Sequence, residues 1–67
     1  MSSVARVIEI SAQSNKSFEA AIESGLARAE KTLRNVTSAW VKEQRLDVKK
    51  GKVTGYQVNL LVTFILD

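Results

Sequence analysis

The sequence predicts an α+β fold in which a three-stranded antiparallel sheet carries one helix on one face, in the order β-α-β-β. Three observations predict it. The C-terminal residues 53–66 are apolar at every second position, and residues 15–34 carry apolar side chains at the three- and four-residue spacing of a helix. Residues 4–10 and 37–48 have the β-branched or alternating pattern of strands.

Residues 53–66 are the segment around which the other elements are expected to pack. One face of this predicted strand carries Tyr56, Val58, Leu60, Val62, Phe64 and Leu66. The opposite face carries Gly55, Gln57 and Asn59, followed by the apolar Leu61 and Ile65. A strand that is apolar on both faces at one end is expected to be central in its sheet or covered by another subunit.

The N-terminal residues 4–10 are expected to form the first strand, and the polar residues 11–17 the connection to the helix. Ser14 is the predicted N-cap of that helix, with Ser17 as the alternative. The helical stripe consists of Phe18, Ala21, Ile22, Gly25, Leu26, Ala29 and Leu33. Gly25 within this stripe indicates a close approach between the helix and the sheet.

After a link at residues 35–36, the second strand is expected over residues 37–48, and the basic residues 49–52 form a hairpin loop. If the helix returns the chain so that the first two strands run in the same direction, an all-antiparallel sheet requires the third strand between them. The helix then covers one face only, and the first two strands are edges.

Length and composition limit the possible functions. A single domain of 67 residues buries little surface, and the absence of cysteine and histidine removes disulfides, zinc-type sites and thiol or imidazole catalysis. Oligomerisation therefore becomes the expected source of stability. The N-terminal apolar run is too short for a signal or membrane helix, so a cytoplasmic location without membrane contact is expected.

The charged residues give no clear catalytic pattern. No nucleophile and base have a recognisable spacing, so an enzyme is not expected. Glu43 and Asp47 are expected on one side of the second strand, either as solvated or salt-bridged carboxylates or as a cation site shared between subunits. Lys49, Lys50 and Lys52 form either a solvated loop tip or, as a minor option, a contact to phosphate or nucleic acid.

Several short segments in order resemble the dodecin family. They are Arg6-Val-Ile-Glu-Ile10, Phe18-Glu-Ala-Ala-Ile22, Ala27-Arg-Ala29, Lys31-Thr-Leu-Arg34, Val41-Lys-Glu43 with Arg45, Tyr56-Gln-Val58 and Val62-Thr-Phe64. The resemblance covers nearly the whole chain. It implies a hollow homododecameric shell that binds a flavin (FMN, riboflavin or FAD) and stores or buffers it without turnover.

The resemblance also implies site residues. Gln57 corresponds to a glutamine that hydrogen-bonds the polar edge of the isoalloxazine ring, and its amide offers both a donor and an acceptor. The alternative is an exposed polar residue without a ligand. Arg45 corresponds to an arginine that either pairs with acidic neighbours at a subunit junction or meets a cofactor phosphate.

The tryptophan that stacks on the flavin in this family corresponds to Ser38, whereas the single tryptophan here is Trp40. A shift of two residues keeps the face of the strand but moves the side chain by about 6.6 Å. Three outcomes follow. A bulge or altered link brings Trp40 into the stacking place, the site is rebuilt around the shifted indole, or flavin binding is lost and Trp40 lies at a subunit contact.

Three hypotheses of different classes therefore remain from the sequence. The first is a flavin-storage shell that uses Trp40 and Gln57. The second is a shell with no ligand or with an inorganic one, such as calcium at Glu43 or Asp47, because residues 41–44 resemble dodecin-like proteins associated with calcium. The third is a small nucleic-acid-binding domain that uses its basic loop, for which binding would depend strongly on salt.

Overall fold

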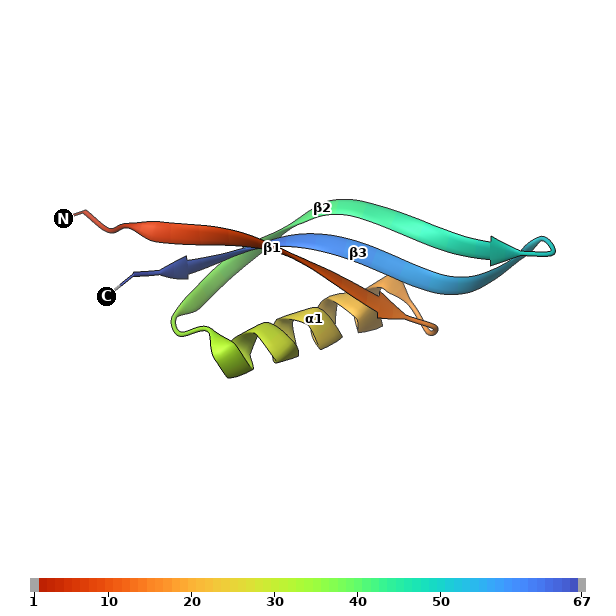
Figure 1. Cartoon of the computed structure of the whole chain (residues 1–67), viewed down its shortest axis with the longest axis horizontal. Helices are drawn as coiled ribbons and strands as arrows, with labels where there is room; N and C mark the ends of the chain where they lie inside the picture. The colour runs from red at the N-terminus through yellow and green to blue at the C-terminus, as the bar shows by residue number, and fades with distance from the viewer. Residues whose placement is uncertain (1, 67) are drawn as a thin grey trace.

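The computed structural model describes residues 2–66 and has four elements (Figure 1). These are β1 (Ala5–Ser14), α1 (Phe18–Thr32), β2 (Val36–Lys49) and β3 (Lys52–Ile65). The sheet order is β1-β3-β2 with both pairs antiparallel. The predicted α+β class, the order β-α-β-β and the central position of the C-terminal strand are confirmed.

Helix α1 is shorter at both ends than the predicted span of residues 15–34. Ser17 is its N-cap, and the Ser17 hydroxyl accepts a hydrogen bond from the backbone N–H of Ala20 at 3.0 Å. The prediction that Ser14 caps the helix is wrong, because Ser14 is the last residue of β1 and its hydroxyl accepts from Lys16 N at 3.0 Å. At the other end, Leu33 has extended backbone and caps the helix through its N–H to Ala29 O.

Strand β1 is longer than residues 4–10 because its polar second half continues the ladder with β3. Pairing runs from Ala5 opposite Ile65 to Ser14 opposite Tyr56. This extension brings the side chains of Ser11 and Gln13 beside Asn59 and Gln57, on the face that α1 does not cover. The polar stretch that resembled a loop in the sequence therefore contributes to the open side of the sheet.

The core lies between α1 and the sheet. Val58, Leu60 and Val62 of β3 are fully buried together with Ala21 of the helix. A Cβ atom added to Gly25 would lie 3.0 Å from Ala12 Cβ and 3.3 Å from Leu60 Cδ1. The predicted close approach of the helix to the sheet at Gly25 is confirmed.

Strands β2 and β3 continue beyond the helix as a two-stranded arm, which gives the chain principal extents of 53 × 19 × 13 Å (Figure 1). The turn at its tip places Lys50 (φ 52°) and Gly51 (φ 78°) in the left-handed region that two-residue hairpin turns need. Helix α1 packs on β1 and β3. The apolar Val41, Leu46 and Val48 of β2 are therefore left exposed.

Candidate functional site

The face of the sheet opposite α1 is called the open face here. It carries Gln57, Asn59, Leu61, Thr63 and Ile65 from β3. The directly paired residues on the flanking strands lie on the same face. They are Ala5, Val7, Glu9, Ser11 and Gln13 of β1, and Ser38, Trp40, Glu43 and Arg45 of β2. The open face is polar toward the hairpin arm and apolar toward the chain termini.

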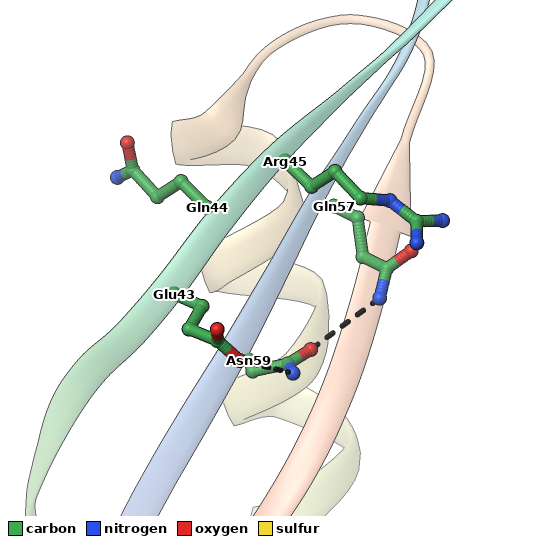
Figure 2. Close-up of a pocket in the computed structure, with 5 residues that line it drawn as sticks. All are labelled: Glu43, Gln44, Arg45, Gln57 and Asn59. Atoms are coloured by element: carbon green, nitrogen blue, oxygen red, sulfur yellow. Dashed lines mark hydrogen bonds between the residues drawn. The ribbon is translucent and has the colours of Figure 1, made fainter.

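A pocket of about 310 Å³ lies in the polar half of the open face. Figure 2 shows its lining residues Glu43, Gln44, Arg45, Gln57 and Asn59. Gln44 points away from the other four, which is consistent with its position between Glu43 and Arg45 on a pleated strand. Gln57 and Arg45 are directly paired, so the structure brings these two predicted site residues together.

A chain of side-chain hydrogen bonds positions Gln57. Its Nε2 donates to Ser11 Oγ at 3.1 Å and to Asn59 Oδ1 at 3.4 Å. Asn59 Nδ2 in turn donates to Glu43 Oε1 at 3.4 Å. Asn59 and Ser11 were not among the residues selected from the sequence. Asn59 could have been found from its place two residues after Gln57, whereas Ser11 required the pairing of β1 with β3.

Trp40 lies on the open face with 60% of its surface exposed and is paired with Leu61. Regular alternation would place residues 40 and 45 on opposite faces of β2. A bulge between Val41 and Glu43 adds one residue, Lys42, and so brings Trp40 to the same face as Arg45. The indole therefore shares a face with Gln57, and its partner Leu61 is four residues, about 13 Å, further along β3.

The bulge does not move Trp40 into the position of Ser38. Ser38 is paired with Thr63, two residues further along β3 than Leu61, and is exposed on the same face. The two-residue displacement expected from the sequence is therefore retained. Of the two positions, Trp40 is the one nearer to Gln57 along the strand.

The two carboxylates proposed as a cation site lie on the open face but bind other partners. Glu43 accepts a hydrogen bond from Asn59. Asp47 accepts from Gln13 Nε2 at 2.8 Å through Oδ2, and its Oδ1 lies 3.5 Å from Arg45 Nη2. Residues 2–66 contain no group of three or more histidine, cysteine, aspartate or glutamate side chains that could hold a metal ion.

Lys42 and the three lysines of the hairpin loop do not line the pocket. Lys42 of the bulge forms an ion pair with Glu9 of β1 at 3.1 Å, across the central strand. Lys49, Lys50 and Lys52 are exposed at the tip of the arm, around the hairpin turn. The structure therefore places the basic loop at the end of the arm, away from Trp40.

The fold and the open face define a small α+β protein whose single helix covers one side of an antiparallel sheet, leaving an indole and a polar pocket on the other. The family model for dodecin matches residues 4–67. A dodecin of Thermus thermophilus is 42% identical over 67 residues, which cover 100% of this chain and 97% of that protein. The chain belongs to the dodecin family.

Solved structures agree with this assignment. A crystal structure of a Thermus thermophilus protein has a TM-score of 0.92 at 41% identity, covering 98% of this chain and 97% of its own. The dodecin of Streptomyces davaonensis has a TM-score of 0.92 at 33% identity, covering 100% and 98%. The calcium dodecin of Mycobacterium tuberculosis, described as having a novel calcium-binding site, has a TM-score of 0.81 at 32% identity, covering 96% and 91%.

Within residues 2–66, no helix combines the length and the apolar character needed to cross a membrane.

Proposed function

We propose that this chain forms a non-catalytic, flavin-binding homododecameric shell that stores or buffers flavin, with residues 1–67 as one domain. The observation that carries the proposal is the exposed indole of Trp40 on the same face as the hydrogen-bonded amide of Gln57. An aromatic side chain that is 60% exposed on a sheet face is suited to binding a second aromatic surface. Membership of the dodecin family supports a flavin as that surface.

Each site residue has a distinct role in this proposal. Trp40 presents its ring face to the isoalloxazine, where offset stacking adds to the gain from burial. Gln57 presents its amide oxygen as an acceptor to the polar edge of the ring, because its two Nε2 hydrogens are donated to Ser11 and Asn59. Its hydrogen bonds to Ser11 and Asn59 reduce the rotamer freedom that binding would otherwise remove. The flavin is the stored molecule in this proposal, and its aromatic ring system is the part that the site binds.

The apolar half of the open face supports assembly. Leu61, Thr63 and Ile65 are only partly buried within one subunit, and Val7 beside them is exposed. A further sign is Thr63, whose buried Oγ1 has no hydrogen-bond partner among the described residues. A second subunit on this half would remove apolar surface from water, and a chain of this size needs such a contribution.

The experiment that tests the proposal is a riboflavin fluorescence titration at a protein concentration where light scattering has established a large assembly. Saturable quenching of the flavin is expected, together with its loss in Trp40→Ala. Val48→Ala is the matched control, because Val48 is also an exposed β2 residue but lies near the tip of the arm. A flat titration of the assembled wild-type protein would overturn flavin storage.

A shell that binds calcium is the second candidate, favoured by the similarity to the calcium dodecin of Mycobacterium tuberculosis. The carboxylates at issue are Glu43 and Asp47, and both oxygens of Asp47 already have partners in Gln13 and Arg45. Calcium would have to displace these partners and overcome the nearby guanidinium charge. Calorimetry with calcium chloride is expected to show no saturable heat, and a saturable heat that Asp47→Asn removes would favour this candidate instead.

A further inference from the structure

We propose that Asp47 makes the open face selective for a flavin without a phosphate group, such as riboflavin, over the phosphorylated flavins FMN and FAD. The inference rests on the proposed function and specifies its ligand class. Its structural basis is a cluster in which Asp47 of β2 binds Gln13 of β1 and Arg45 of its own strand, above Gly55 of β3.

Gly55 allows this cluster to form. It is buried and is the strand partner of Asp47, and a Cβ atom added to it would lie 3.1 Å from Asp47 Oδ2. Because no side chain projects from β3 at this point, the carboxylate of Asp47 extends over the central strand and accepts a hydrogen bond from Gln13 at 2.8 Å. The two edge strands are thus joined directly, and Asp47 is held on the open face.

As a consequence, the positive charge of Arg45 is already paired with the carboxylate of Asp47. Arg45 Nη2 lies 3.5 Å from Asp47 Oδ1, and Glu43 is the other charged residue in the pocket lining. The pocket and its neighbour Asp47 therefore carry two carboxylates against one guanidinium. Lys42 does not change this balance, since it pairs with Glu9. A phosphate monoester, with a charge of about −1.5 to −2 at neutral pH, would meet repulsion here.

A second cavity beside Asp47 has the chemistry of a polyol site. Its volume is about 250 Å³. Its lining residues are Gln13, Ser14, Asn15, Asp47, Thr54 and Gly55. None of the six is a lysine or arginine, whereas amide, hydroxyl and carboxylate groups can donate to and accept from alcohol groups. The cavity thus fits the hydroxyl groups of a ribityl chain better than a phosphate.

The test compares dissociation constants for riboflavin and FMN, measured by fluorescence quenching on the assembled wild-type protein and on Asp47→Asn. The asparagine variant keeps the shape and an acceptor for Gln13 while removing the negative charge. Wild-type protein is expected to bind riboflavin more tightly than FMN. Asp47→Asn is expected to strengthen FMN binding about fivefold while riboflavin binding changes less than about twofold. Glu30→Gln, on the outer side of α1, is the matched control and should change neither the riboflavin nor the FMN dissociation constant.

Salt provides a readout that needs no variant. The preference of the wild-type protein for riboflavin over FMN is expected to shrink as ionic strength rises from low salt, because repulsion between exposed charges is screened. FMN binding as tight as riboflavin binding in the wild type would overturn the selectivity, as would equal changes for both ligands in Asp47→Asn. If neither flavin binds the assembled protein, the proposed function fails, and the selectivity fails with it.

Discussion

Trp40 lies directly opposite Leu61 on the open face of the sheet, two residues from the position at which the family resemblance places a stacking tryptophan. The pairing keeps the indole on the same face as Gln57 because the bulge at Lys42 changes the alternation of β2 between Trp40 and Arg45. The site proposed here is therefore one in which the aromatic group has moved along the strand without changing sides.

This displacement can be tested by moving the indole back. In the double variant Ser38→Trp/Trp40→Ala, the tryptophan occupies a position that is exposed on the same face, opposite Thr63. We expect riboflavin quenching, lost in Trp40→Ala alone, to be recovered to within about tenfold of the wild-type affinity, because stacking depends mainly on the ring and its face. The measurement is the fluorescence titration already described. No recovery in an assembled double variant would show that position 40 itself is required.

Assembly through the apolar half of the open face predicts a strong effect of charge at Leu61. Leu61→Asp places a carboxylate beside Trp40 and Glu9, and burial of an unpaired charge at an interface costs several kcal/mol. We expect the variant to elute as a much smaller species in size-exclusion chromatography with light scattering. Leu61→Met, which keeps the apolar surface, should elute with the wild type. Elution of Leu61→Asp at the wild-type size would show that this face is not an interface.

Truncating substitutions in the core between α1 and the sheet are expected to lower stability most. Leu60 is 1% exposed and lies against Gly25 of the helix. Leu60→Ala should lower the free energy of unfolding by about 2–5 kcal/mol, because it removes buried methyl groups and leaves a cavity. Val48→Ala, at a residue that is 62% exposed, should change it by less than about 0.5 kcal/mol. Denaturant unfolding at one fixed protein concentration measures both, since the proposed assembly would make stability depend on concentration.

The two serines considered as helix caps are expected to contribute different amounts to stability. Ser17→Ala removes the acceptor for Ala20 N–H and should destabilise the protein by about 1 kcal/mol. Ser14→Ala removes an exposed turn contact to Lys16 and should cost less than about 0.5 kcal/mol. Equal losses in thermal unfolding would contradict the assignment of Ser17 as the cap.

Much of the fold could be predicted from the sequence because few arrangements satisfy its patterns. The alternation of residues 53–66 required a strand with one fully apolar face, and Val58, Leu60 and Val62 are indeed the buried core. The helical stripe with Gly25 required a helix close to that face. Two edge strands and a central third strand then followed from the connection order.

The site was less predictable because it depends on features that simple alternation does not contain. The bulge at Lys42 sets the face of Trp40, and β2 has no glycine or proline that would indicate it in advance. The Gln13–Asp47 hydrogen bond required β1 to continue through a polar stretch that resembled a loop, and required Gly55 to leave the space between the edge strands. Both are tertiary effects that override local sequence preference.

The strongest test of flavin binding at Trp40 and Gln57 is a crystal structure of the assembled protein with riboflavin bound. We predict an isoalloxazine ring stacked on the indole of Trp40, with its polar edge hydrogen-bonded to the amide of Gln57. A ring bound to other side chains, with Trp40 buried in a subunit contact and Gln57 free of ligand, would contradict it.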